Sequence, residues 1–163
     1  MNRRTTLMLT SVTLLGLAIG IPQTAFAQSD PLLGIWQLNL AKSKYSGPAP
    51  KSGTLYFQGE GQNRKGTAVT IDAAGNPGML VIPSYVDDGQ SHPLTATPAL
   101  AYDAGANTRV DAYTVTVSRT KAGKVVQTGT RVVSQDGKTL TFTVTGTGVN
   151  GEPINNITVY DKQ

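Results

Sequence analysis

The sequence contains no cysteine and only one histidine in 163 residues, and both shortages exclude chemistry. Without cysteine there can be no disulfide, no thiol nucleophile and no cysteine metal site. His92 alone supplies neither a histidine metal cluster nor an acid–base pair, and a serine nucleophile would have only this base. His92 precedes Pro93 in a polar stretch, so we expect a solvated surface residue. The sequence predicts no catalytic residue, no metal site, no cofactor and no enzyme activity.

Charged residues make up only 15% of the chain, and neither sign dominates. The 14 Lys+Arg and 10 Asp+Glu are interleaved along the sequence. Nucleic-acid-binding proteins normally carry a basic stripe, so we expect no nucleic-acid partner. Asp87 and Asp88 are adjacent carboxylates in a turn-like stretch, where we expect them to stay solvated. Loop capping or weak cation binding is the alternative for this pair.

The longest apolar stretch lies at the start of the chain and has the form of a signal peptide. Arg3 and Arg4 give a short positive region, and residues 7–21 are apolar and uncharged. Ala25 and Ala27 place small residues where a signal peptidase requires them. We therefore predict a signal peptide over residues 1–27, cleavage between Ala27 and Gln28, and a single domain over residues 28–163.

This segment predicts a periplasmic or secreted protein. A membrane anchor is the alternative, but a spanning helix needs about 20 apolar residues and this stretch is shorter and interrupted by Thr and Gly. No cysteine follows it, which excludes lipoprotein processing. The Arg3-Arg4 pair suits either the general secretory or the twin-arginine route. After removal of the signal we expect no stable membrane span.

Alternation of apolar and β-branched residues predicts a domain built from strands. Within residues 139–145, Leu140, Phe142 and Val144 alternate with threonines, which puts apolar side chains on one face and hydroxyls on the other. Residues 112–120 repeat the pattern, and no segment after the signal predicts a helix longer than a turn or two. Further strands are expected over residues 33–40, 54–60, 67–72, 78–86, 124–134 and 153–161.

Short glycine-containing turns connect the expected strands. Asp-Gly and Asn-Gly, as in residues 135–138 and 150–153, supply the positive φ that tight hairpins require. Residues 112–161 therefore form an antiparallel meander. The complete pattern predicts an all-β domain, an antiparallel up-and-down β-barrel of about eight or nine strands, because closure removes exposed edges. A two-sheet β-sandwich is the alternative.

Two groups of residues carry a resemblance to known proteins. Gly34-x-Trp36 precedes a Leu-Asn-x-Ala-Lys-Ser-Lys-Tyr run over residues 38–45, and the second group lies at residues 130–139 and 159–163. Together they resemble a family of small exported bacterial proteins, largely uncharacterised and described as lipocalin-like or calycin-type. The resemblance covers nearly the whole of residues 28–163. It implies a barrel around a cavity that takes a small, partly apolar ligand.

The resemblance to true lipocalins implies a structural pair at the closed end of the barrel. In that family the tryptophan of Gly-x-Trp packs beneath a basic side chain, so we expect Arg131 stacked on Trp36 through a cation–π contact. Ordinary core packing of Trp36 is the alternative. The sequence departs from lipocalins because it lacks their Thr-Asp-Tyr-type motif and a helix after the barrel, and because Arg131 lies well before the last strand.

Three classes of function remain open from the sequence. The first is a non-catalytic binder of a small, partly apolar molecule, which requires a cavity of about 300 Å³ or more. The second is a structural or interaction protein of the cell envelope, with a packed interior. The third is an enzyme that uses carboxylates or tyrosines at the barrel mouth, which buried ionisable residues in a cleft would favour. We expect the first class.

Overall fold

The computed structural model describes residues 30–60 and 62–163, whose strands form one antiparallel sheet. The predicted signal peptide and the Ala27–Gln28 cleavage site lie outside the described residues. In chain order the strands are β1 (Gly34–Leu38), β2 (Ser52–Glu60), β3 (Asn63–Ile71), β4 (Pro77–Tyr85), β5 (Asp88–Pro93), β6 (Thr95–Thr97), β7 (Ala104–Arg109), β8 (Thr114–Lys121), β9 (Lys124–Val133), β10 (Thr139–Thr147) and β11 (Pro153–Lys162). A single-turn 3-10 helix, η1 (Leu40–Lys42), follows β1.

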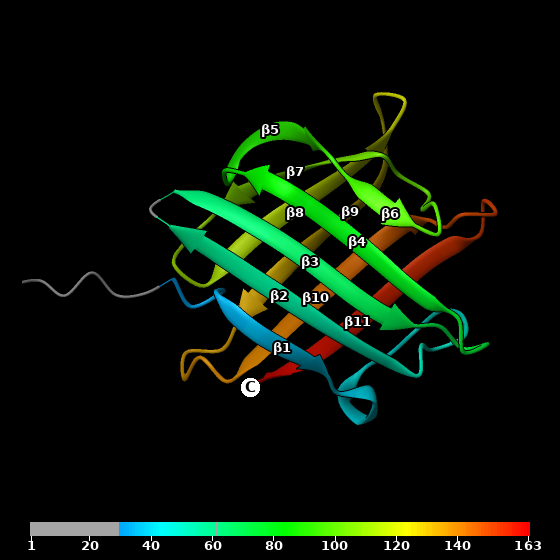
Figure 1. The fold of residues 1–163 in the computed structure, drawn as a ribbon, viewed down its shortest axis with the longest axis horizontal. Helices are drawn as coiled ribbons and strands as arrows, with labels where there is room; N and C mark the ends of the chain where they lie inside the picture. Colours follow the sequence, from blue (N-terminus) through cyan, green and yellow to red (C-terminus); the bar gives the residue numbers. More distant parts are fainter. Residues whose placement is uncertain (1–29, 61) are drawn as a thin grey trace, which may run out of the picture.

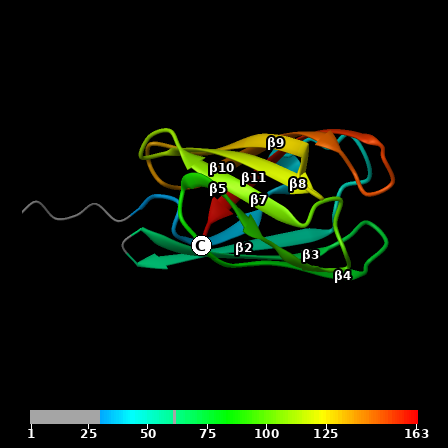
Figure 2. The same ribbon diagram turned by 90° about the horizontal axis from the view of Figure 1, so that it is seen from above.

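The sheet curls into a nearly closed barrel. Its strand order is β5-β7-β8-β9-β10-β11-β1-β2-β3-β4-β6. The two edge strands, β5 and β6, are separated in the chain only by Leu94, so one bent segment pairs first with β7 and then with β4. Figures 1 and 2 show the resulting flattened barrel, in which β2–β4 lie opposite β8–β10. The predicted all-β barrel is confirmed, with a single continuous sheet where the sandwich alternative requires two.

The barrel has eleven strands instead of the eight or nine expected. All eight segments that the alternation indicates are strands, while β5, β6 and β7 are additional. Residues 87–109 are rich in alanine and interrupted by Pro93 and Pro98, so their local preference for strand is weak. They become strands because neighbouring strands offer backbone partners: β7 pairs with β8 over its full length.

The most deeply buried residues of the apolar core lie at one end of the barrel. Trp36 and Leu140 are completely buried there, and Val115 is almost so. On β8 and β10 the apolar residues point inward and the threonines outward, as the alternation predicts. We call this end, which also carries the segment from Asp30 to Leu33, the closed end. Across the residues that the structure describes, no helix has the length and apolarity needed to cross a membrane.

Candidate ligand-binding cavity

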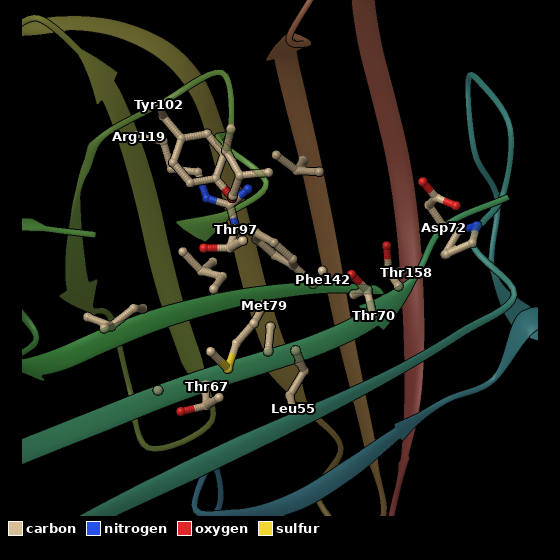
Figure 3. Close-up of a pocket in the computed structure, with 18 of the residues that line it drawn as sticks. Leu55, Thr67, Thr70, Asp72, Met79, Thr97, Tyr102, Arg119, Phe142 and Thr158 are labelled. Atoms are coloured by element: carbon tan, nitrogen blue, oxygen red, sulfur yellow. The ribbon is translucent and has the colours of Figure 1, made fainter. Parts of the chain in front are cut away.

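A cavity of about 390 Å³ lies inside the barrel (Figure 3). Its volume exceeds the minimum of about 300 Å³ expected of a binding protein. The interior is therefore hollow at this end, in contrast to the packed closed end. Most of the wall is apolar, with Leu55, Phe57, Ala68, Leu80, Ile82, Pro98, Leu100, Phe142 and Val144 among the lining residues.

Small residues on β3 create part of this space. Leu55, Ala68 and Leu80 are register partners across β2, β3 and β4, so a short side chain stands between two longer ones. Gly66 precedes Ala68 by one inward position, and a Cβ at Gly66 would meet the Ile82 Cδ1 atom at 3.3 Å. The alternation of the strands thus builds the apolar wall, and the small residues keep it from filling.

Arg131, on β9, brings a positive charge to this apolar wall. Its side chain is 6% exposed, and its Nη1 donates a hydrogen bond to the Asn107 Oδ1 atom at 3.1 Å. The guanidinium carbon lies 5.0 Å from the centre of the Phe142 ring and 5.3 Å from that of Phe57. Burial lowers the pKa of Arg131, because the charged form loses its hydration.

Arg119, on β8, adds a second guanidinium to the cavity. It lies 4.4 Å from the centre of the Tyr102 ring and 5.1 Å from that of Phe142. Figure 3 shows Tyr102 and Arg119 packed together at one side of the cavity. Its Nη1 donates to the Gln127 Oε1 atom at 3.0 Å, and Gln127 in turn donates from Nε2 to the Thr147 carbonyl at 2.9 Å.

Within residues 30–60 and 62–163, neither cavity arginine is ion-paired with a carboxylate, although the charge of Asp87 acts on Arg131 from a greater distance and opposes the lowering of its pKa. The ion pairs found among residues 30–60 and 62–163 include neither Arg119 nor Arg131. Asp72 is the single acid among the described lining residues, and Figure 3 places it on the opposite side of the cavity from Arg119. Hydrogen bonds from the side chain and backbone of Asn76 lower the pKa of Asp72 and hold it in the β3–β4 turn. The cavity therefore has a positive inner region.

Phenol groups supply further polar atoms to the wall. Tyr45, Tyr102 and Tyr160 line the cavity. Burial raises the pKa of Tyr160 strongly, and burial also raises that of Tyr45 against the opposing effect of hydrogen bonds with Thr158 and Ser43. Tyr45 and Tyr160 thus remain neutral at physiological pH, so each can donate a hydrogen bond.

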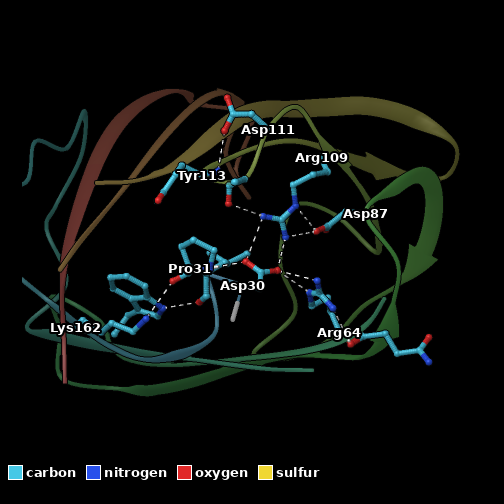
Figure 4. Close-up of polar contacts among 12 residues, drawn as sticks. Asp30, Pro31, Arg64, Asp87, Arg109, Asp111, Tyr113 and Lys162 are labelled. Atoms are coloured by element: carbon cyan, nitrogen blue, oxygen red, sulfur yellow. Dashed lines mark hydrogen bonds and ion pairs between the residues drawn. The ribbon is translucent and has the colours of Figure 1, made fainter. Parts of the chain in front are cut away.

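The expected pairing of Trp36 with Arg131 does not form, and the cation at Trp36 is Lys162. The Lys162 Nζ atom lies 4.9 Å from the centre of the Trp36 ring and donates to the Pro31 carbonyl at 3.1 Å (Figure 4). The reason is strand order: Lys162 on β11 is the register partner of Trp36, whereas β10 and β11 separate Arg131 from β1. In a closed barrel the last strand pairs with the first. A basic residue on the last strand is therefore the sequence signal that predicts the cation next to Trp36.

Gly34 explains the first position of the Gly-x-Trp motif. Its φ of +129° is a conformation that side chains rarely adopt, and a Cβ there would lie 2.9 Å from the Lys162 Cε atom. The absence of a side chain lets Lys162 pass over the strand to the indole. Trp36 itself donates from Nε1 to the Leu32 carbonyl at 2.8 Å, which satisfies its buried N–H.

Four charged side chains form a network at the closed end (Figure 4). Asp30 accepts from Arg64 Nη2 at 2.8 Å and from Arg109 Nη2 at 2.6 Å, and Asp87 accepts from the same Arg109 atom at 2.7 Å. Burial alone would lower the pKa of Arg109, but the charges of Asp30 and Asp87 outweigh it and raise the pKa. The expectation of a solvated Asp87 is wrong, because its side chain is 8% exposed and paired with Arg109.

His92 lies on β5 and is less exposed than expected. Its side chain is 25% exposed, and its Nε2 lies 3.9 Å from the Asp88 Oδ1 atom. Asp88 remains 45% exposed. Among the described residues, no group of three His, Asp or Glu side chains is arranged to hold a metal ion.

Comparison with known proteins identifies related folds but no family. No protein-family model and no curated protein matches the sequence. The crystal structure of Rv2717c from M. tuberculosis matches with a TM-score of 0.50 and 15% identity, covering 82% of this chain and 93% of that one. Zebrafish ileal bile acid-binding protein complexed with cholic acid matches with a TM-score of 0.45 and 11% identity, covering 82% of this chain and 98% of that one. At its low identity, the first likeness shows a common fold and nothing further.

Proposed function

We propose that this protein is an exported, non-catalytic binding protein whose cavity takes a small amphipathic molecule with an anionic group. The observation that carries the proposal is the pair of guanidiniums, Arg119 and Arg131, in a cavity that is otherwise largely apolar. The signal-like residues 1–27 support export to the periplasm or beyond. A hollow interior speaks against a purely structural protein with a packed barrel.

The charge of the cavity favours an anion. A buried cation without a counter-ion is costly, and a bound carboxylate or similar group would relieve that cost. In the described structure each guanidinium uses one N–H in a hydrogen bond, to Asn107 or to Gln127. An arginine side chain has five N–H donors, so both retain donors for a ligand. Charge-assisted hydrogen bonds of this kind are roughly twice as strong as neutral ones.

The dimensions of the cavity limit the size of the ligand. A volume of about 390 Å³ lies near the lower end of the range of about 300–1,000 Å³ for small-molecule sites, so the cavity takes a small ligand. The apolar walls stabilise an aliphatic or aromatic body at about 25 cal/mol per Å² buried. The carboxylate of Asp72 repels an anion from the far side of the cavity. The anionic group therefore lies inward, at Arg119 and Arg131.

Decanoate and decanamide test this proposal, because they have the same length and differ in charge. We expect calorimetry at neutral pH to show decanoate binding about ten- to a hundredfold more tightly, the factor that charged hydrogen bonds contribute. The double variant Arg119→Met/Arg131→Met should lose this preference, whereas the exposed control Lys124→Met should keep it. Equal affinity of the wild-type protein for the two compounds would overturn the proposal.

A further inference from the structure

The two cavity arginines are each hydrogen-bonded to a neutral amide. Asn107 is on β7 and Gln127 on β9, and they are 4% and 5% exposed. Asn107 accepts from Arg131 at 3.1 Å, and Gln127 accepts from Arg119 at 3.0 Å. Neither amide lines the cavity, so neither reaches a ligand there. Each acts on the cavity through the arginine that it holds.

We propose that Asn107 and Gln127 set the charge specificity of the cavity by orienting Arg131 and Arg119 without neutralising them. This inference rests on the proposed function. Aspartate has nearly the same size and shape as asparagine, so packing does not dictate an amide at position 107, whereas Gln127 must also donate to the Thr147 carbonyl. A carboxylate would accept the same hydrogen bond and would also cancel the charge. The amide leaves the cation available to an anionic ligand.

At the closed end of the same barrel, the buried arginines have carboxylate partners in place of amides. Arg64 and Arg109 are also largely buried, and both are bonded to carboxylates. Where the arginines only hold the barrel together, their charge is cancelled within the protein. A buried cation without a counter-ion lowers the free energy of unfolding. The amide partners therefore keep the cavity able to bind an anion but reduce the stability of the protein.

The orientation of Gln127 supports a positioning role. Its Nε2 donates to the Thr147 carbonyl at 2.9 Å, which fixes the amide so that Oε1 faces Arg119. Arg119 is further held against the Tyr102 ring. The guanidinium is therefore directed by one hydrogen bond and one ring contact, and neither contact removes its positive charge.

The double variant Asn107→Asp/Gln127→Glu tests the inference with almost no change in side-chain volume. We expect the preference for decanoate over decanamide to fall by about tenfold or more, toward equal binding, since the anion now meets neutralised arginines. Decanamide affinity should stay close to that of the wild type. The single variant Asn107→Asp should raise the midpoint of thermal unfolding, because the buried guanidinium of Arg131 gains a counter-ion, whereas Gln127→Glu also loses the hydrogen bond to the Thr147 carbonyl. A merely structural role of the amides would move neither the preference nor the midpoint in these directions.

The variant Asn107→Leu/Gln127→Met is the matched control, because it removes both hydrogen bonds without adding charge. It should bind both compounds more weakly while still preferring decanoate. If the wild type prefers decanoate and Asn107→Asp/Gln127→Glu keeps that preference, this inference alone is overturned. If the wild type has no preference, the proposed function fails together with it.

Discussion

At the closed end of the barrel, Arg64 and Arg109 are bonded to carboxylates, whereas Arg119 and Arg131 in the cavity are bonded to amides. All four side chains come from strands of one sheet. The difference lies in the partner, and the partner determines whether the charge is used up inside the protein. Arginine in the interior of this fold therefore has two roles, which its burial alone does not distinguish.

Asp30 connects two separate strands at the closed end. It precedes β1 and accepts hydrogen bonds from Arg64 on β3 and from Arg109 on β7. These two strands are not neighbours in the sheet, so the carboxylate connects opposite parts of the barrel wall. The cavity has no such cross-connection among its described charged residues. The charged residues of the closed end thus hold the barrel wall together, whereas those of the cavity leave it open to a ligand.

The largest expected effect comes from Trp36→Ala, which tests whether the closed end carries most of the stability. The indole is completely buried, and loss of a buried Trp typically costs about 3–5 kcal/mol. Urea unfolding followed by circular dichroism measures the change. Val125→Ala, at a position that is 61% exposed, is the control and should be nearly neutral. A loss below about 1 kcal/mol would place the main core elsewhere.

Asp30→Asn sharpens the comparison of the two sets of arginines. The substitution removes the charge that Arg64 and Arg109 share and leaves Arg109 paired with Asp87, and breaking a buried pair costs about 3–5 kcal/mol. We expect the lower end of that range, because the side chains of the network are 8–24% exposed. The exposed Glu60→Gln is the control in the same unfolding experiment. Unchanged stability would mean that the closed-end network resembles an ordinary surface ion pair.

Lys162→Met tests whether Lys162 is the cation that stabilises Trp36. Methionine keeps the length of the side chain but removes the charge, so the cation–π contact of about 0.5–2 kcal/mol is lost. A double-mutant cycle with Trp36→Phe should give a coupling energy, whereas a cycle between Trp36 and Arg131 should give none. Coupling of Trp36 to Arg131 in place of Lys162 would contradict the structure. The native fluorescence of this single tryptophan should be blue-shifted and should move to the red on unfolding.

The smallest effect is expected at alkaline pH. Burial raises the pKa of Tyr45, Tyr85 and Tyr160, and at Tyr85 the charge of Arg131 opposes it. The folded state thus favours the neutral phenols, so their contribution to stability is complete below the ordinary tyrosine pKa of about 10 and is lost as pH rises through the raised values. Ultraviolet absorbance should show Tyr45, Tyr85 and Tyr160 ionising later in the native than in the unfolded chain. Coincident titration curves would mean that these phenols are exposed.

The sequence was sufficient where local pattern and tertiary structure agree. On β10, alternation predicted both the strand and the inward side chains of Leu140, Phe142 and Val144. It was insufficient over residues 87–109, where strands form because neighbours offer backbone partners. Turn chemistry suggested a solvated loop there, and the burial of Asp87 depends on Arg109, which is distant in the sequence.

The cavity arginines could have been found from the same alternation. Arg119 follows Val115 and Val117 at intervals of two on β8, and Arg131 precedes Val133 by two on β9. Both therefore point inward with the core valines. The lipocalin resemblance pairs Arg131 with Trp36, but the order of the strands places Lys162 beside the indole and Arg131 two strands farther away. The neutral partners of the arginines depend on long-range packing, which no local pattern reveals.

The bent segment of β5 and β6 has a consequence for how the barrel opens and forms. β1 and β11, far apart in the sequence, are joined within the sheet, while the seam of the barrel lies in mid-chain at Leu94. Pairing of distant strands closes a long loop and is slow, whereas hairpins form early. The seam is held by a three-residue strand on one side and an irregular ladder on the other. Backbone amides at the seam should therefore exchange with solvent at a lower opening free energy than those of β10. Local opening of this barrel is expected at the mid-chain seam and not where the first and last strands pair.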